Sequence, residues 1–127
     1  MMNLLLDTHV FLWALDDSPF LSQKARSALI DGSNIIFVSA ATAWEISIKR
    51  AIGKLHLPEG NYMDELRLHR FTPLNITTEH ALAVEQLPLH HKDPFDRLLV
   101  AQAQIEKLTL ITHDAHIMQY AISFIET

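Results

Sequence analysis

The chain has 127 residues, 49% of them hydrophobic and 20% charged, and its formal net charge is −5 because 15 acidic side chains outnumber 10 basic ones. These proportions are typical of one globular domain and exclude a largely disordered chain, so we expect a single domain over residues 1–127. The chain has no cysteine, which excludes a disulfide scaffold, a cysteine zinc site and a thiol nucleophile. No apolar run approaches the ~18–20 residues of a membrane span, and we expect a cytoplasmic protein without membrane contact.

Short apolar runs alternate with amphipathic stretches along the sequence. The apolar runs predict strands at residues 4–6, 35–38, 71–76, 109–112 and 122–125. Helical spacing of apolar residues and capping signals predict helices at residues 9–15, between 22 and 32, and at 39–52, 62–69, 78–86, 94–107 and 114–120. This alternation predicts an α/β fold with a central, mainly parallel sheet of four to five strands and helices on both faces, in which Pro73 places its strand at an edge.

Some apolar side chains on these helices are predicted to be buried. Ala81, Leu82 and Val84 are the expected core positions of the helix at residues 78–86. Trp13 and Trp44 lie on apolar stripes, and we interpret them as core residues rather than as platforms on which bases stack.

Two acidic residues follow predicted strands. Asp7 comes directly after the first strand, and Asp114 comes after the strand at 109–112 with one intervening residue. Ligands bind beyond the carboxyl ends of the strands in parallel α/β sheets, so both side chains are candidates for a functional site. The alternative is that each residue caps the helix that follows it.

Glu45 shares a helix face with the apolar residues at positions 41, 44, 48 and 52. This spacing predicts that its carboxylate is buried. A buried carboxylate is rare unless it is paired or bound to a cation, because taking the charge out of water is unfavourable. The alternative is a surface ion pair with Lys49, one helical turn later.

The segment at residues 91–97 combines a turn with a helix start. Asp93 suits an N-cap and Pro94 the first helical position, while Asp96 falls in the first turn, where the helix dipole favours an acid. Asp96 also begins the apolar face at positions 99, 100 and 103 that should pack on the sheet. We therefore expect a functional role for Asp96 and a capping role for Asp93.

The candidate catalytic and metal-binding residues are the four carboxylates Asp7, Glu45, Asp96 and Asp114. Four carboxylates gathered in one place repel each other unless a cation lies between them. Mg²⁺ or Mn²⁺ suits oxygen ligands and activates water for phosphodiester hydrolysis. The hydroxyl groups of Thr8, Ser39 and Thr112 are candidates for orienting an acid, and each is equally well explained as an ordinary helix cap.

Four blocks occur in order along the chain: DTH at residues 7–9, WEI at 44–46, DPFDRLLVAQA at 93–103 and THD at 112–114. Together they resemble the PIN-domain ribonucleases, and most closely the VapC-type toxins of prokaryotic toxin–antitoxin pairs, over essentially the whole chain. His9 departs from the pattern, because many relatives carry asparagine there.

The resemblance implies a PIN-like domain and an endoribonuclease that depends on Mg²⁺ or Mn²⁺. It maps the family's acidic positions onto the four carboxylates named above. It also implies a homodimer, a VapB-type antitoxin whose tail blocks the acidic pocket, and a structured target such as transfer or ribosomal RNA.

Basic side chains must contact phosphate if the substrate is RNA, and Lys49 and Arg97 are the candidates. His113 and His116 flank Asp114, where one of them could move protons, although exposed loop histidines are common.

Two other functions stay open. One is a phosphoryl-accepting receiver or phosphatase with Asp7 as nucleophile, but position 9 is histidine where such phosphatases carry a second aspartate. The other is a non-catalytic α/β interaction module that keeps the fold.

Overall fold

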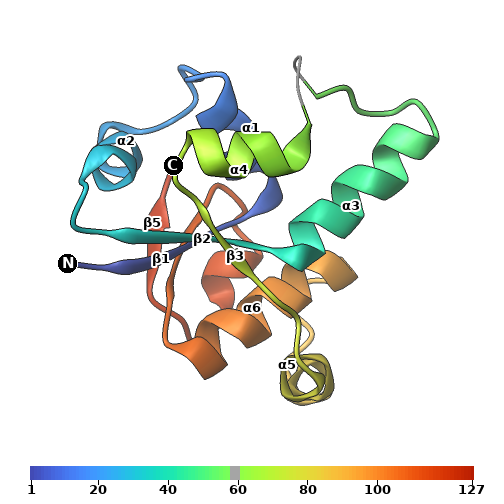
Figure 1. Cartoon of the computed structure of the whole chain (residues 1–127). Helices are drawn as coiled ribbons and strands as arrows, with labels where there is room; N and C mark the ends of the chain where they lie inside the picture. Colours follow the sequence, from blue (N-terminus) through green and yellow to red (C-terminus); the bar gives the residue numbers. More distant parts are fainter. Residues whose placement is uncertain (58–60) are drawn as a thin grey trace.

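The computed structural model describes residues 1–57 and 61–127. Strands and helices alternate along the described chain, as Figure 1 shows. The strands are β1 (Asn3–Leu6), β2 (Ile35–Ser39), β3 (Thr72–Leu74), β4 (Thr109–Thr112) and β5 (Phe124–Glu126). The helices are α1 (Thr8–Leu15), α2 (Gln23–Ile30), α3 (Ala40–Ala51), α4 (Tyr62–Leu68), α5 (Thr78–Ala83) and α6 (Pro94–Glu106), with the 3₁₀ turns η1 (Val84–Gln86) and η2 (Ile117–Gln119).

Within the described residues, five strands form a parallel sheet in the order β3-β2-β1-β4-β5. β1 is the central strand, and its three leucines are fully buried. Leu6 pairs with Val38 of β2 and lies beside Ile111 of β4, so these three strands end together at one edge of the sheet. The predicted parallel sheet and the edge position of the strand that contains Pro73 are both confirmed.

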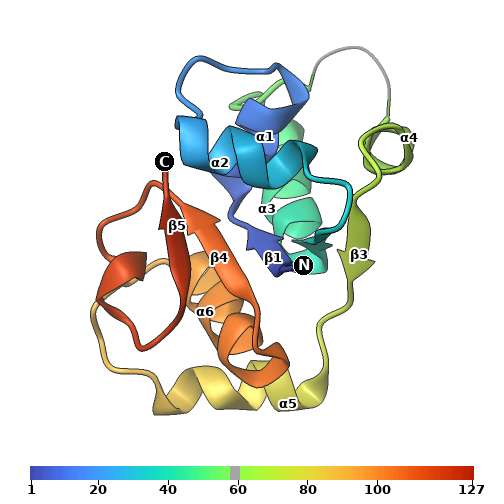
Figure 2. The same cartoon turned by 90° about the vertical axis from the view of Figure 1, so that its left-hand side faces the viewer.

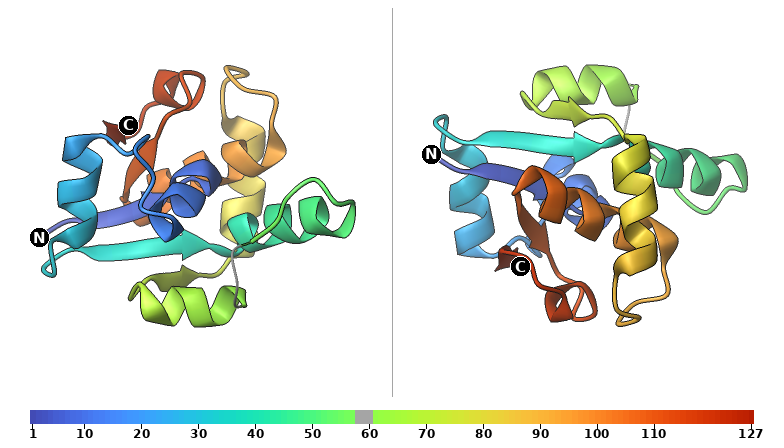
Figure 3. Two further views of the ribbon diagram at one scale, coloured as in Figure 1. Left: turned by 90° about the horizontal axis from the view of Figure 1, so that it is seen from above. Right: turned by 90° about the horizontal axis from the view of Figure 1, so that it is seen from below.

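Helices cover both faces of this sheet. In Figure 1, α1, α2 and α4 lie above it and α5 and α6 lie below it, and Figure 3 shows the two faces in turn. Leu4 and Leu6 pack in one core with Phe11 of α1, whereas Leu5 packs in the other with Leu99 of α6. Figure 2 shows β4 and β5 on the side of the molecule away from β3. None of the helices in residues 1–57 and 61–127 has both the length and the apolar character needed to cross a membrane.

The helix that follows β3 turns a different face inward from the predicted one. Ala81 and Leu82 are exposed, whereas His80 is buried. His80 forms a capping box with Thr77, and its Nδ1 atom lies 3.3 Å from the side-chain nitrogen of Gln102 in α6. The predicted burial of Ala81 and Leu82 is therefore wrong, because the hydrogen bonds of a buried histidine orient α5, whereas Val84, in η1, is partly buried against the core as predicted.

The segment after β4 is also shorter in helix than predicted. In place of a helix at residues 114–120 it forms the 3₁₀ turn η2. The Asp114 carboxylate accepts hydrogen bonds from the backbone N–H groups of His116 and Ile117, and Tyr120 leaves the turn in an extended conformation. This compact turn keeps Asp114 close to the end of β4.

Candidate metal centre

Asp7 lies where β1 passes into α1. Its Oδ1 atom accepts a hydrogen bond of 2.8 Å from the Val10 N–H, which makes it the N-cap of α1. Its Oδ2 atom accepts a hydrogen bond of 2.6 Å from the hydroxyl of Thr112, at the end of β4. The side chain is 4% exposed. Asp7 is thus a helix cap, and its carboxylate also joins the ends of two adjacent strands.

Glu45 is buried as predicted, with 6% of its surface exposed, but not for the predicted reason. Of the apolar stripe that indicated its burial, Ala41 is buried, but Trp44 and Ile52 face solvent and are 59% and 61% exposed. Trp44 is therefore not the core residue that the sequence predicted. Glu45 instead faces α1, where the Thr8 hydroxyl donates to its Oε1 atom at 2.8 Å. Lys49 donates to Oε2 at 2.7 Å, so the ion pair forms around a buried carboxylate.

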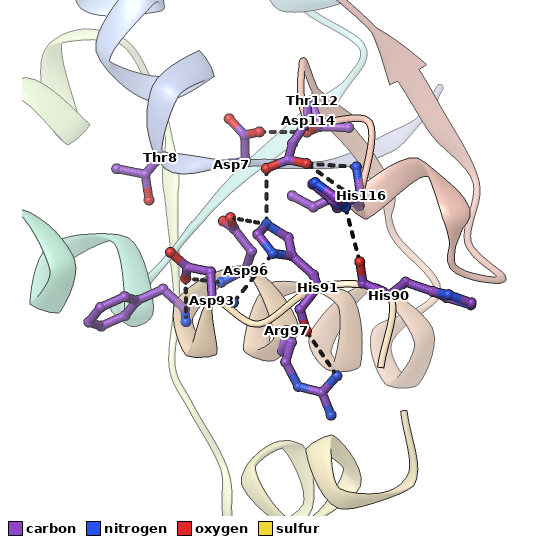
Figure 4. Close-up of polar contacts among 12 residues, drawn as sticks. Asp7, Thr8, His90, His91, Asp93, Asp96, Arg97, Thr112, Asp114 and His116 are labelled. Carbon is purple, nitrogen blue, oxygen red and sulfur yellow. Dashed lines mark hydrogen bonds and ion pairs between the residues drawn. The ribbon is translucent and has the colours of Figure 1, made fainter. Parts of the chain in front are cut away.

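Asp93 and Asp96 have different roles at the start of α6: the first caps the helix and the second faces the cavity. Asp93 is the N-cap, and its Oδ1 atom accepts hydrogen bonds from the N–H groups of Phe95 and Asp96 at 2.8 and 3.0 Å. Pro94 occupies the first helical position, as predicted. Because Asp93 satisfies these N–H groups, the Asp96 carboxylate is free to point toward His91, as Figure 4 shows.

His91 is the residue of this site that sequence analysis did not assign to it. Its Nε2 atom lies 2.9 Å from Asp96 Oδ2 and 3.0 Å from Asp114 Oδ2, contacts that Figure 4 marks with dashed lines. The three atoms lie within 4.8 Å of one another. Two adjacent loop histidines give no signal of which ring turns inward; in the structure, His90 packs edge-on against Tyr120 instead.

An open cavity of about 310 Å³ connects these groups. All four carboxylates predicted from the sequence line it, and the other lining residues are Thr8, His9, Lys49, His91, Asp93 and His113. The acids follow β1, lie in α3 and α6, and follow β4, so the fold brings together residues that are far apart in the chain. The cavity lies beyond the carboxyl ends of β1 and β4, where parallel α/β folds bind ligands.

Crowding of the acids changes their protonation. Burial raises the pKa of Asp7, although the hydrogen bond from Thr112 opposes this effect. Burial also raises the pKa of Asp96 to about 7, and repulsion from Asp93 and Asp7 adds to the increase. Burial acts on Asp114 too, but backbone hydrogen bonds from η2 and the neighbouring imidazole outweigh it and lower its pKa. The site therefore has more negative charge than its own cations balance.

This donor set fits a divalent cation. Carboxylate oxygens from several chain segments face one cavity, and such oxygens are the ligands that Mg²⁺ and Mn²⁺ prefer. A doubly charged ion between the acids would relieve the repulsion that raises the pKa of Asp96. The arrangement can therefore hold a metal ion without a change of fold.

The remaining predicted residues occupy different places. Ser39 is buried and caps α3, accepting a hydrogen bond from the Ala41 N–H at 3.0 Å. The Arg97 guanidinium donates to carbonyl groups of the loop before α6 and, at 3.1 Å, to the hydroxyl of Tyr120. Of the two predicted RNA contacts, Lys49 is the one that lines the cavity.

Comparisons with known proteins agree with this architecture. One similar solved structure is a chain of VapBC2 from Rickettsia felis bound to a promoter DNA fragment, with a TM-score of 0.72, 16% sequence identity and 98% of each chain covered. Another is a chain of DNA-bound VapBC from Salmonella typhimurium, with a TM-score of 0.65, 14% identity, and coverage of 99% of this chain and 98% of that one. A third is a chain of FitAcB from Neisseria gonorrhoeae, with a TM-score of 0.58, 17% identity, and coverage of 97% of this chain and 96% of that one. No curated protein matches the sequence.

These identities are low, so the likeness to the solved structures establishes a shared fold. The sequence itself matches a family model, described as the PIN domain, over residues 4–123. That match runs from β1 through β4, ends just before β5, and includes every segment that contributes to the cavity. The chain belongs to the PIN domain family.

Proposed function

We propose that this PIN domain is a metal-dependent endoribonuclease and the toxin of a toxin–antitoxin pair. PIN domains are generally metal-dependent nucleases. The observation that carries the proposal is the set of four acids lining one cavity of this fold. Hydrolysis of a phosphodiester by water needs no serine or cysteine nucleophile, which agrees with the absence of cysteine from the chain.

The acids proposed to hold Mg²⁺ or Mn²⁺ are Asp7, Glu45, Asp96 and Asp114. When bound, the cation supplies polarisation of the phosphate and activation of the attacking water. The hydroxyl groups of Thr112 and Thr8 orient Asp7 and Glu45, and each carboxylate oxygen keeps a further lone pair for a ligand. Ser39 acts one step further away, since it begins the helix that carries Glu45.

The proposed substrate is RNA, with transfer or ribosomal RNA as the class that the family resemblance favours. Lys49 lines the cavity beside Glu45 and offers a cation for phosphate above an acidic floor. Arg97 is engaged by the loop before α6 and by Tyr120, so its contribution to RNA binding ranks second.

A VapB-type antitoxin is the proposed protein partner, since the structural neighbours include VapBC and FitAB chains. α3 carries an exposed apolar strip, defined by Trp44, Ile48 and Ile52. The Trp44 ring packs edge-on against Phe95 at a centroid distance of 5.0 Å, and these two residues immediately precede Glu45 and Asp96. An antitoxin segment along this strip would bury apolar surface and bring its tail over the acids. A homodimer, which the resemblance implies, completes the proposed assembly.

Cleavage assays test the enzymatic proposal. The purified chain is incubated with cellular RNA, with Mg²⁺ or Mn²⁺ or with excess EDTA, and the products are sequenced. We expect cuts at defined positions that require the metal and disappear in Asp7→Asn. Glu79→Gln, a change of an exposed acid on α5, is the control that keeps activity. Cleavage that persists in EDTA contradicts the proposal, and antitoxin binding without cleavage supports the non-catalytic interaction module.

Co-purification tests the partner. The chain is co-expressed with the product of a short adjacent reading frame, and we expect the two proteins to purify together. Ile48→Glu places a charge in the apolar strip and should abolish co-purification. Ile30→Glu changes an equally apolar, exposed residue on α2 and should leave it intact. If both variants still bind, the antitoxin uses another surface.

A further inference from the structure

The His91 ring enters the cavity between two of the proposed metal-binding acids. Its Nε2 atom lies 2.9 Å from Asp96 Oδ2 and 3.0 Å from Asp114 Oδ2. One N–H group points at one acceptor. In the absence of a metal ion, a proton on Nε2 is shared between Asp114 and Asp96, which lie at nearly the same distance from it.

These distances match the spacing of ligands around a metal ion. In an octahedral site with metal–ligand bonds of about 2.1 Å, neighbouring ligand atoms lie about 3.0 Å apart. Nε2 has this separation from both carboxylate oxygens, and the three atoms lie within 4.8 Å of one another. A cation could therefore contact all three after small side-chain movements.

The loop holds His91 in place from its backbone side. The His91 N–H donates to the Tyr120 hydroxyl at 3.0 Å, and Arg97 donates both to this hydroxyl and to the His91 carbonyl. The ring Nδ1 atom accepts a bond of 3.3 Å from the Asp93 N–H. Coordination through Nε2 places the ring proton on Nδ1, so the bond from the Asp93 N–H is lost, while the hydrogen bond of 3.0 Å from the His91 N–H to Tyr120 still holds the residue beside the acids.

We infer that His91 is a ligand of the divalent cation, through Nε2, together with Asp96 and Asp114, and that it makes the site prefer Mn²⁺ to Mg²⁺. Mg²⁺ takes oxygen ligands and retains its water, whereas imidazole nitrogen suits transition metals, whose affinities increase from Mn²⁺ along the series. The inference rests on the proposed function, since it concerns the cation of the same site.

Pulsed electron paramagnetic resonance of the full chain loaded with Mn²⁺ tests this assignment directly. A directly bound imidazole gives a ¹⁴N modulation in the spectrum of the ion. We expect this modulation in the unaltered chain and its loss in His91→Gln. His9 and His113 also line the cavity, so His9→Gln and His113→Gln are the matched controls and should retain the signal.

Calorimetric titration supplies a second measurement. We expect His91→Gln to weaken Mn²⁺ binding by about tenfold or more and to change Mg²⁺ binding much less. A Mn²⁺ spectrum without ¹⁴N modulation in the unaltered chain overturns the inference, even if His91→Gln does not fold. If the unaltered chain lacks the modulation but still binds Mn²⁺ tightly, the carboxylates alone bind the ion and the nuclease proposal stands. If the chain binds neither Mn²⁺ nor Mg²⁺, the inference about His91 and the nuclease proposal are both wrong.

Discussion

The hydroxyl of Thr112 donates a hydrogen bond of 2.6 Å to Asp7 Oδ2, which joins the ends of β4 and β1. The Thr112 Oγ1 atom also accepts a hydrogen bond of 3.0 Å from the Asp114 N–H. One fully buried threonine therefore orients an acid that follows each of two adjacent strands. The relative positions of Asp7 and Asp114 are therefore set by the parallel pairing of β1 with β4.

Thr112→Val removes this hydroxyl and keeps the shape of the side chain. Asp7 and the Asp114 N–H each lose a buried partner, so we expect the free energy of unfolding to fall by about 1–3 kcal/mol in urea titrations. Mn²⁺ affinity measured by calorimetry should fall by about tenfold. Thr109→Val, at the other end of β4, is the control for the strand itself. An unchanged Mn²⁺ affinity in Thr112→Val would show that Asp7 does not need this orientation.

Substitutions of Asp7 separate its capping role from its charge. Asparagine is as good an N-cap as aspartate and lacks the charge, so Asp7→Asn should keep or raise the thermal midpoint while RNA cleavage is lost. Asp7→Ala also loses the bond to the Val10 N–H, and should be less stable than Asp7→Asn by about 1 kcal/mol. If Asp7→Asn unfolds as readily as Asp7→Ala, the charge itself is structural.

Protonation of Asp96 predicts how stability depends on pH when no metal is bound. The folded chain raises the pKa of this carboxyl from 3.8 to about 7, so the folded state holds the proton more tightly than the unfolded state. Stability should therefore decrease as pH rises through the interval between these values, and the loss is complete above it. We expect Asp96→Asn to raise the thermal midpoint by roughly 5 °C at about pH 8 and very little at about pH 4.

Thermal scans in EDTA across this range provide the measurement. Asp64→Asn, a change of an exposed acid on α4, controls for the loss of one negative charge. Equal shifts for Asp96→Asn at both ends of the range would mean that the gain does not come from its proton.

Local rules were sufficient where one element decides the outcome. The positions of Asp7 and Asp114 were predicted from strands that end at one edge of a parallel sheet, and the N-cap role of Asp93 was predicted from helix-capping preferences. Glu45 shows the limit of such rules. Its burial was predicted from an apolar stripe that is mostly exposed beyond Ala41. The buried face of α3 instead combines Ala41 and Ile46 with Thr42 and Glu45, and Glu45 meets Thr8 of α1 there.

His91 required knowledge of tertiary contacts. Its loop has no helical or strand period, and its conformation depends on Arg97 and on Tyr120, which lies 29 residues away. Periodicity describes one segment at a time, so it cannot indicate which of two adjacent histidines faces acids from other segments. The exposed position of Trp44 was missed for a similar reason, since its partner ring belongs to Phe95 at the start of another helix.

The Lys49–Glu45 ion pair predicts a metal-dependent effect on stability. Lys49→Met leaves a buried carboxylate without its cation, and because Lys49 itself is partly exposed we expect a loss of about 1–2 kcal/mol in the metal-free chain. A double-mutant cycle with Glu45→Gln should recover most of this loss. Saturating Mn²⁺ should reduce the loss if Glu45 faces the ion, and an equal loss with and without Mn²⁺ would place Glu45 outside the metal site.

Arg97 gives a test that distinguishes bracing of the loop from contact with RNA. Its guanidinium donates to loop carbonyl groups and to Tyr120, so Arg97→Met should lower the free energy of unfolding by about 2 kcal/mol. It should also weaken Mn²⁺ binding, since His91 loses its support. Arg67→Met, which removes an exposed arginine from α4, should change neither property. If Arg97→Met instead keeps stability and Mn²⁺ affinity but weakens RNA binding in a salt-dependent way, the guanidinium binds RNA phosphate and does not stabilise the loop.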